Sequence, residues 1–316
     1  MRCVIGVDLG GTNVRAGAYY EDGAEAGPKF SNPSRAQSGT EAVFDAVSRT
    51  ILEAAQAAET PPVAVGMAIP GMVDDLRGVV AWSSNFGETI NGVFHYWQHV
   101  DVRKPIEDRV GLPVRFGNDA NLAALAEYRF GTGRNRAKCL VMLTLGTGIG
   151  GGVVFSPDAL LGESRGHLLL LGGNVGGAEL GHVVVQADGM VSNAGVYGDI
   201  EAYCGRDAIV TRAVHRLKRN RESLLDEMVG GDWSKISPKT IAEAAERGDE
   251  VALEVFDEVG TMLGVGIGNY INIFAPDVFA IGGQVAKAGD ALLKPAIRTA
   301  RNIAVPALFE FCRITV

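Results

Sequence analysis

The chain is short of cysteine and of long apolar runs. Its four cysteines lie far apart in 316 residues and show no CxxC spacing, so the sequence predicts neither a disulfide framework nor a zinc ribbon. No apolar run approaches the roughly 18 residues that a membrane-spanning helix requires, and the first residues lack the apolar stretch of a signal peptide. We therefore expect a cytoplasmic protein without a membrane partner. The cysteines are Cys3, Cys139, Cys204 and Cys312.

Basic residues are also few, because 29 lysines and arginines stand against 37 acidic residues and give a net charge of −8. An acidic chain of this kind is a poor binder of nucleic acid, so we expect no nucleic-acid partner. The hydrophobic share of 47% and the charged share of 21% are those of an ordinary globular protein. At roughly 150 residues per domain, the length suggests two domains, each with its own core.

Glycine is abundant, with 42 residues, and it is clustered. The clusters follow apolar, strand-like runs, whereas flexible linkers scatter glycine among serines. Such clusters indicate turns that need a positive φ or a close approach to a ligand, so we interpret them as binding loops. They lie at residues 10–11, 146–152, 172–173, 176–177 and 282–283.

Hydrophobic periodicity predicts a mixed α/β chain. Two strand–glycine–strand hairpins, one in each half, suggest an internally duplicated architecture. The predicted strands are residues 3–7, 14–20, 63–69, 114–117, 139–145, 153–155 and 278–281. The predicted helices are residues 41–58, 120–128, 206–227 and 238–272.

The two hairpin turns suit a polyphosphate. The first follows Asp8 and reads Gly-Gly-Thr, and it opens no helix, unlike a dinucleotide-binding GxGxxG loop or a Walker loop. Its backbone N–H groups can face an anion, and Asp8 can face a Mg²⁺ ion that the anion carries. One such turn by itself is also explained as a tight hairpin. The second turn and the glycine pair at residues 282–283 favour a nucleotide site.

The ordered motifs resemble a known superfamily. DLGGTN at residues 8–13, LGTGIGG at 145–151 and IGG at 281–283 resemble the first phosphate, second phosphate and adenosine motifs of actin-like ATPases. AIPGMVD at residues 68–74, GNDAN at 117–121 and ELGH at 179–182 resemble the ROK family of sugar kinases and repressors. The resemblance runs from the first strand to about residue 283.

This resemblance implies a fold and a reaction. The fold is α/β, with two actin-like ATPase (ribonuclease H-like) domains flanking a cleft, residues 1–117 and 118–316. The reaction is transfer of the γ-phosphoryl group of ATP, with Mg²⁺, to the 6-hydroxyl of a hexose, for which glucose is the first choice. Fructose, N-acetylglucosamine and N-acetylmannosamine stay open as substrates. The residues implied for ATP and Mg²⁺ are Asp8, Gly10, Gly11, Thr12, Asn13, Gly146, Thr147, Gly148, Gly282 and Gly283.

Asp119 is the candidate general base, because phosphoryl transfer to an alcohol needs a carboxylate near the hydroxyl that loses its proton. It stands between a strand and a helix, so it could also simply cap that helix. The family resemblance favours catalysis. The residues implied for sugar binding are Gly71, Asn85, Asn118, Asp119, Glu179, His182 and Glu201.

Three of the residues implied for sugar binding also have a purely structural explanation. Glu179 and His182 could be a surface glutamate and a capping histidine, and Asn85 could be a turn asparagine. Because Glu179 and His182 are three residues apart in a glycine-flanked segment, both side chains could instead reach one ligand with several hydroxyl groups.

The sequence departs from the family where many members carry three cysteines after the ELGH motif. Here the corresponding residues are Ser192, Ala194 and Asp199. A structural zinc ion needs four nitrogen or sulfur ligands, so we expect no zinc. The ring of His182 must then be held by another partner.

Two further departures concern length. Residues 156–171 are longer than the family's usual connection, and we prefer a buried strand there to an oligomer surface. The chain ends in a strand-like run at residues 311–316, which predicts that the family's C-terminal helix, returning to the first domain, is missing.

Rival functions fit less well. A repressor would need a DNA-binding motif before the first phosphate strand, where only seven residues precede Asp8. A non-catalytic or chaperone-like member of the ATPase superfamily would have no need of the GNDAN and ELGH motifs together. A non-catalytic sugar-sensing protein is the less favoured alternative. We expect a homodimer or homotetramer of the kinase, with hexose and ATP as its ligands.

Overall fold

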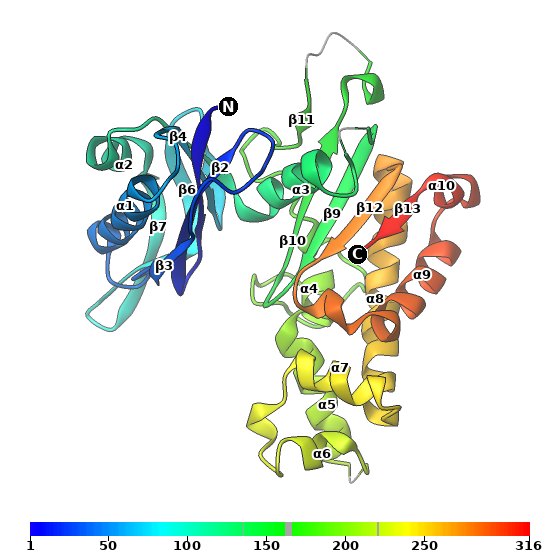
Figure 1. Ribbon diagram of the computed structural model, residues 1–316. Coiled ribbons are helices and arrows are strands. Elements are labelled where there is room, and N and C mark those ends of the chain that lie inside the picture. Colours follow the sequence, from blue (N-terminus) through cyan, green and yellow to red (C-terminus); the bar gives the residue numbers. More distant parts are fainter. Residues whose placement is uncertain (135, 162–165, 220) are drawn as a thin grey trace. The chain divides into compact units, whose positions relative to one another are not determined.

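The computed structural model of the chain describes residues 1–134, 136–161, 166–219 and 221–316. The chain forms two compact units, which are described one by one (Figure 1). Unit 1 consists of Met1–Leu122 and Leu171–Gly177, and unit 2 consists of Ala123–Leu170 and Ala178–Val316. The units divide inside helix α3 (Asp119–Phe130). The division into domains between residues 117 and 118 stays a prediction.

A mixed sheet with the strand order β3-β2-β1-β4-β8 forms the centre of unit 1. β1 pairs antiparallel with β2, while β1, β4 and β8 run parallel to one another. A smaller antiparallel sheet has the order β5-β6-β7. The strands are β1 (Cys3–Leu9), β2 (Asn13–Tyr20), β3 (Phe30–Pro33), β4 (Pro62–Ile69), β5 (Met72–Asp74), β6 (Val79–Ile90), β7 (Val93–Asp101) and β8 (Val114–Asn118).

Helices α1 (Thr40–Gln56) and α2 (Arg103–Val110) lie on the same side of these strands (Figure 1). The apolar residues of α1 recur at helical spacing and are buried, among them Val43, Val47 and Ile51. They pack with the inward side chains of β1, such as Ile5 and Val7. The burial of alternate residues along β1 leaves Asp8 exposed on the opposite face.

Unit 2 repeats this sheet topology, with the order β11-β10-β9-β12-β13. β9 pairs antiparallel with β10, and β9, β12 and β13 run parallel. The duplication predicted from the two hairpins is therefore confirmed at the level of sheet topology. The strands are β9 (Cys139–Leu145), β10 (Ile149–Phe155), β11 (Leu168–Leu169), β12 (Val278–Gly282) and β13 (Arg313–Thr315).

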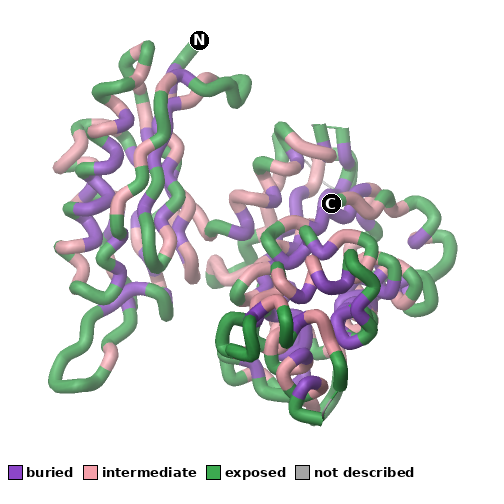
Figure 2. The backbone as a smooth tube through the Cα atoms, turned by 60° about the horizontal axis from the view of Figure 1, so that its bottom comes forward, coloured by how far each residue is buried: buried purple, intermediate pink, exposed green. Residues whose placement is uncertain are grey.

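The long helix α8 (Glu250–Phe274) contributes buried residues along its length to the core of unit 2. Figure 2 shows by colour which parts of the backbone are buried. Gly260, Gly264 and Gly268 lie on its side that faces α9, and a Cβ atom at any of them would meet atoms of α9. The missing side chains let the two helices pack closely. The helices are α4 (Ile200–Cys204), α5 (Arg206–Leu217), α6 (Leu224–Met228), α7 (Pro238–Glu246), α8 (Glu250–Phe274), α9 (Asp290–Ile303) and α10 (Pro306–Phe311). Single 3₁₀ turns are η1 (Pro157–Ala159), η2 (Leu180–His182), η3 (Trp233–Lys235) and η4 (Val285–Ala288).

Two predicted helices were wrong in their extent. The helix predicted over residues 206–227 is two helices, α5 and α6, and Ser223 caps the second by accepting a hydrogen bond from the Leu225 N–H. The helix predicted over residues 238–272 is also two, because Gly248 takes a φ of +83° and Asp249 caps α8. Apolar periodicity continued across both breaks and hid them.

The glycine run at residues 146–152 is only partly a turn. Residues 149–152 belong to β10, which begins at Ile149 rather than at residue 153. Gly151 is needed there for packing, since a Cβ atom would lie 2.7 Å from the side chain of Leu180. The glycine thus brings the η2 segment against the sheet.

The predicted buried strand within residues 156–171 is short and only half-buried. Strand β11 pairs at the edge of the sheet with Val154 and Phe155, while Leu161 is fully exposed. Residues 162–165 of that segment lie outside the described residues. At the C-terminal end, the strand-like run predicted from residue 311 begins at Arg313, because Phe311 ends α10. None of the helices in the described residues has the length and apolar character that a membrane span needs.

The cap of α8 gives a prediction about stability. The buried Asp249 carboxylate accepts hydrogen bonds from the Ala252 N–H at 2.8 Å, the Leu224 N–H at 2.7 Å and the Ser223 hydroxyl at 3.1 Å. Asp249→Ala removes the cap and leaves buried donors unpaired, so we expect a loss of about 1–3 kcal/mol of stability, seen as a lower urea midpoint.

Asp232→Ala is the matched control, since Asp232 caps the exposed turn η3 in the same unit. Equal midpoints for the two variants would contradict the structural role of Asp249.

Candidate active site

The predicted residues of unit 1 gather at one edge of its sheet. β1, β4 and β8 are parallel neighbours, and their register places Asp8 beside Ala68 and Ile69 beside Asn118. The carboxyl ends of parallel strands meet at the same edge, where open α/β sheets bind ligands. The first hairpin turn, the turn at Gly71 and the pair Asn118 and Asp119 therefore lie at one edge.

The first hairpin turn (residues 10–12) is exposed and open. It is closed by a hydrogen bond from the Gly10 N–H to the Asn13 carbonyl at 2.9 Å. Among the described residues, the N–H groups of Gly11 and Thr12 donate to no protein acceptor. Neither glycine of the turn has a positive φ, so the predicted conformational reason for them was wrong. Their use is to leave two adjacent donors uncovered.

Asn85 lies in β6, not in a turn, so the alternative as a turn asparagine was wrong. The register between β6 and β7 shifts between Ser83 and Gly87, which marks a bulge that holds Asn85 at the surface. A Cβ atom at Gly11 would lie 3.6 Å from the Asn85 Nδ2 atom. The bulge thus brings the Asn85 amide beside the first hairpin turn.

Gly71 and Asn118 are tied together. The Asn118 Nδ2 group donates to the Gly71 carbonyl at 3.1 Å, and the Ser83 hydroxyl donates to the Pro70 carbonyl at 2.8 Å. Gly71 has a φ of +117°, and a Cβ atom there would collide with the Trp82 carbonyl, so only glycine fits this turn.

Asn118, not Asp119, caps helix α3. The Asn118 Oδ1 atom accepts a hydrogen bond from the Asn121 N–H at 3.0 Å, which is the geometry of an N-cap. Asp119 is the first residue of the helix, and its Oδ1 atom accepts from the adjacent Ala120 N–H at 2.8 Å. The capping explanation of Asp119 is therefore wrong, and its carboxylate has an oxygen left for other chemistry.

The pKa of the Asp119 carboxyl is raised above its ordinary value. Desolvation by surrounding protein atoms is the largest cause, and the negative charge of Asp8 adds to it, while the Ala120 N–H opposes it. The side chain is nonetheless exposed to solvent. A carboxylate that is reachable and more basic than usual suits proton abstraction.

Unit 2 holds the second hairpin turn (residues 146–148) in the same way. The Gly146 N–H donates to the Gly148 carbonyl at 2.9 Å, and the N–H groups of Thr147 and Gly148 donate to no protein acceptor among the described residues. The register places Gly282 of β12 beside Thr144 of β9. Both hairpin turns therefore present two adjacent free donors.

The Gly282 and Gly283 pair lies next to the second hairpin turn. Gly283 has a φ of +95°, and a Cβ atom there would collide with the backbone of Leu145, the last residue before the turn. The structure thus brings together the two glycine motifs that the sequence separates by more than a hundred residues.

Glu201 contacts this turn as well. Its Oε2 atom accepts a hydrogen bond from the Ile149 N–H at 3.0 Å, and a Cβ atom at Gly148 would collide with the same carboxylate. Its Oε1 atom has no hydrogen-bond partner among the described residues. The sequence assigned Glu201 to sugar binding alone and gave no sign of this contact with the turn.

Residues 179–182 run along the sheet of unit 2. Leu180 is buried, whereas Glu179 is exposed and His182 is half-buried. The Tyr270 hydroxyl of α8 donates to the Leu180 carbonyl. No sequence pattern linked Tyr270 to this segment, because the two residues are 90 positions apart.

His182 has the partner that the sequence required but did not identify. Its Nδ1 atom lies 2.8 Å from the Oδ2 atom of Asp199, whose side chain is fully buried. The Ser192 hydroxyl donates to the same oxygen at 2.7 Å. Asp199 therefore contacts His182 directly, and Ser192 donates to Asp199.

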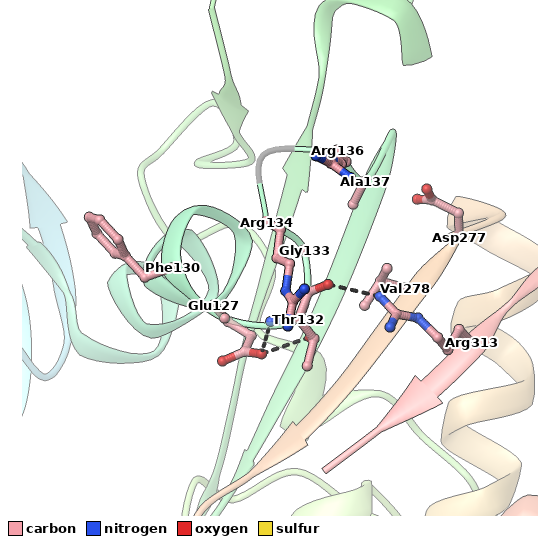
Figure 3. Close-up of a pocket in the computed structure, with 11 residues that line it drawn as sticks. Glu127, Phe130, Thr132, Gly133, Arg134, Arg136, Ala137, Asp277, Val278 and Arg313 are labelled. Atoms are coloured by element: carbon pink, nitrogen blue, oxygen red, sulfur yellow. Dashed lines mark hydrogen bonds between the residues drawn. The ribbon is translucent and has the colours of Figure 1, made fainter. Parts of the chain in front are cut away.

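A cavity of about 630 Å³ in unit 2 contains none of the predicted site residues (Figure 3). Arg134, Arg136 and Arg313 line it, and Arg313 donates to the Thr132 carbonyl at 2.8 Å. The carboxylate of Asp277 accepts from the backbone N–H groups of Lys138 and Cys139. The Asp277 contacts join the starts of β9 and β12, and the Arg313 contact joins β13 to the segment after α3.

Known proteins share this chain's sequence and fold. A glucokinase of Thermotoga maritima is 37% identical over 293 residues, which span 92% of this chain and 85% of that protein. A xylose repressor of Caldicellulosiruptor bescii is 26% identical over 254 residues, which span 80% of this chain and 57% of that protein.

A solved structure is similar over nearly the whole chain. It is a ROK family glucokinase from Streptomyces griseus in complex with glucose and AMPPNP, with 32% identity and a TM-score of 0.78 over 96% of this chain and 90% of that one. The actin-like ATPase fold predicted from the motifs is thereby confirmed. The model of the ROK family matches residues 4–311, and the chain belongs to this family.

Proposed function

We propose that this chain is an ATP-dependent glucokinase, which transfers the γ-phosphoryl group of ATP to the 6-hydroxyl of glucose. The observation that carries the proposal is the shared edge in unit 1, where a turn with free N–H donors and the basic carboxylate of Asp119 end neighbouring strands. The similarity to the Thermotoga and Streptomyces glucokinases supports glucose as the hexose.

Asp119 acts as the general base in this proposal. Its carboxylate accepts the proton of the 6-hydroxyl as the hydroxyl oxygen attacks the γ-phosphorus atom, and the bond to the leaving ADP oxygen breaks. A raised pKa makes the carboxylate a stronger base than an ordinary aspartate. Asn118 can still bind a sugar hydroxyl, because each of its amide atoms makes one hydrogen bond and has capacity for a second.

Both hairpin turns bind phosphate oxygens through their free N–H groups, which need no reorganisation when negative charge develops. Mg²⁺ carried by ATP would neutralise phosphate charge. The Asp8 carboxylate supplies the oxygen ligands that a hard cation prefers. Its ion pair with Arg15, at 3.7 Å, joins two exposed side chains and leaves the carboxylate open to solvent. Gly282 and Gly283 lie against the adenosine part of ATP in this proposal.

The sugar-binding residues predicted from the sequence offer polar groups in each unit, taken one by one. Glu179 and His182 supply an acceptor and a ring nitrogen, and the free oxygen of Glu201 supplies another acceptor. Gly71 and Asn85 belong to the same set in unit 1. The protein is proposed to act in the cytoplasm as a homodimer or homotetramer, without nucleic-acid or membrane partners, with domains dividing between residues 117 and 118.

A sugar-sensing role is the second candidate, because the xylose repressor matches over 80% of this chain. Such a protein binds sugar without consuming ATP. Fructose and the N-acetylhexosamines are alternatives within the kinase proposal, since one stereocentre or acetyl group is selected by details of pocket shape.

The proposed function is tested with purified protein, ATP, Mg²⁺ and a panel of glucose, fructose, mannose, N-acetylglucosamine and N-acetylmannosamine. We expect ADP release that depends on sugar, the highest kcat/KM for glucose, and glucose 6-phosphate as the product by ³¹P NMR. Glucose binding without ADP release would favour the sugar-sensing role. A higher kcat/KM for another sugar would contradict glucose as the preferred substrate.

Asp119→Asn tests the general base. We expect kcat to fall by about 100-fold or more, the scale of lost proton transfer, with little change in the KM for glucose. The substitution removes a charge that Asp8 repels, so the melting temperature at pH 7 should not fall. Turnover close to that of the unsubstituted enzyme would remove Asp119 from the mechanism.

The raised pKa of Asp119 also predicts a pH profile. A carboxyl whose pKa is raised on folding stabilises the fold below its unfolded-state pKa, and this contribution is lost as pH rises through the folded-state pKa. Catalysis has the opposite sign, because only the ionised base works. We expect kcat/KM to fall on the acid side with a midpoint above 3.8, the ordinary value, while stability does not fall in step. Loss of both together would show acid unfolding instead.

Gly11→Val tests the phosphate role of the first hairpin turn. A β-branched side chain beside the free N–H groups would obstruct a phosphate, so we expect the KM for ATP to rise about tenfold or more, with the KM for glucose changed much less. Gly66→Val in β4 is the control, since its Cβ atom would meet nothing within 4 Å and it lies outside the turn. An unchanged KM for ATP in folded Gly11→Val would contradict the role of the turn.

A further inference from the structure

The segment around Asp199 does not fit the zinc ion that the family's cysteines imply. Structural zinc takes four nitrogen or sulfur ligands. The Ala194 side chain offers no metal-ligand atom, and the oxygens of Asp199 already accept from Ser192 and the Ala202 N–H and contact His182. No cluster of three or more histidine, cysteine, aspartate or glutamate side chains suited to a metal exists in the described part of the chain.

We propose that Asp199 is a positioning residue that replaces the metal and sets which nitrogen of His182 faces the sugar. The inference rests on the proposed function for the identity of the ligand. The Asp199 side chain accepts from the Ser192 hydroxyl and the Ala202 N–H, so it acts as an acceptor, and we assign the proton of the His182 contact to the Nδ1 atom. The Nε2 atom of the neutral ring is then an acceptor for a sugar hydroxyl.

The backbone builds this arrangement. The two segments that carry His182 and Asp199 run beside each other, with a bridge between Val184 and Asp199 and a hydrogen bond from the Ile200 N–H to the Val183 carbonyl at 3.1 Å. Asp199 also caps α4 by accepting from the Ala202 N–H at 2.8 Å. Backbone contacts of residues 199 and 200 and the cap on α4 therefore fix the position of the Asp199 carboxylate that contacts His182.

Burial makes the contact specific. The Asp199 side chain is 0% exposed, whereas that of His182 is 27% exposed. The carboxylate end of the pair is shielded from water, which strengthens its hydrogen bonds, and the ring reaches the surface. Ser192, which is 8% exposed, donates to the same Oδ2 atom and keeps the carboxylate oriented.

The same short helix also carries Glu201, two residues after Asp199, and Glu201 accepts from the Ile149 N–H of the second hairpin turn. A single cap thus holds a histidine and a glutamate that are both proposed to bind the sugar. Asp199 thus fixes both the start of α4 and the ring of His182.

Asp199→Asn tests the proposal, because asparagine keeps the size of the side chain and can still cap α4. If its Oδ1 atom keeps the cap on the Ala202 N–H, its amide group takes the place of the Oδ2 atom that both His182 and Ser192 contact, so the shared acceptor is lost. We expect the KM for glucose to rise about 10- to 100-fold, as for other partners that orient a histidine, with kcat changed less than about threefold. Asp232→Asn, at an exposed cap in the same unit that contacts no histidine, should leave both unchanged.

A double-mutant cycle separates positioning from general destabilisation. If Asp199 acts through the ring, Asp199→Asn in a His182→Ala background adds no further change in the KM for glucose. An additive loss in the double variant would overturn the proposal. The ¹⁵N shifts of His182 at alkaline pH give a readout that needs no turnover: we expect a protonated Nδ1 in the unsubstituted protein and a shifted tautomer balance in Asp199→Asn.

These readouts fail separately from the proposed function. A protein that fails to phosphorylate glucose can still show the Nδ1 tautomer and its loss in Asp199→Asn. That result would support the positioning role of Asp199 and contradict the glucokinase proposal. Protein purified without added metal is also analysed for zinc. Stoichiometric, tightly bound zinc, together with inactivation by a zinc chelator in excess Mg²⁺, would contradict the proposal that Asp199 replaces the metal. A tautomer unchanged by Asp199→Asn would do the same.

Discussion

The pairing of an antiparallel hairpin with parallel strands is the constraint on which the rest of this structure depends. In unit 1, β2 returns along β1, and β4 and β8 extend the sheet in the direction of β1. The turn of the hairpin and the ends of the parallel strands must then share one edge. Unit 2 has the same arrangement with β9, β10 and β12. Strand register therefore places the two hairpin turns, Asp119 and the Gly282 and Gly283 pair.

Both hairpins and the position of Asp119 could be predicted from the sequence, because the patterns that indicate them lie within a few neighbouring residues. Apolar runs ending in glycine located both hairpins, and the strand–Asn118–Asp119–helix order placed the proposed base between β8 and α3. The boundaries failed where apolar periodicity continued through a break, as at Gly248, and where glycine served packing inside a strand, as at Gly151.

The contacts that complete the site could not be predicted in this way. Glu201 reaches Ile149 across 52 positions, and Tyr270 reaches Leu180 across 90. The contact between Asp199 and His182 spans only 17 positions, yet the sequence showed it merely as a missing cysteine. Propensity and spacing describe neighbours along the chain, whereas these hydrogen bonds depend on how elements pack.

The central claim is that Asp119 removes the proton from the 6-hydroxyl of glucose. A crystal structure with glucose and a non-hydrolysable ATP analogue tests it most directly. The account predicts the O6 atom of glucose at about 2.6–3.2 Å from an Asp119 carboxylate oxygen, with the γ-phosphate within reach of O6 and of the free N–H groups of a hairpin turn. Glucose bound with O6 beside another side chain, and Asp119 outside hydrogen-bond reach, would contradict it.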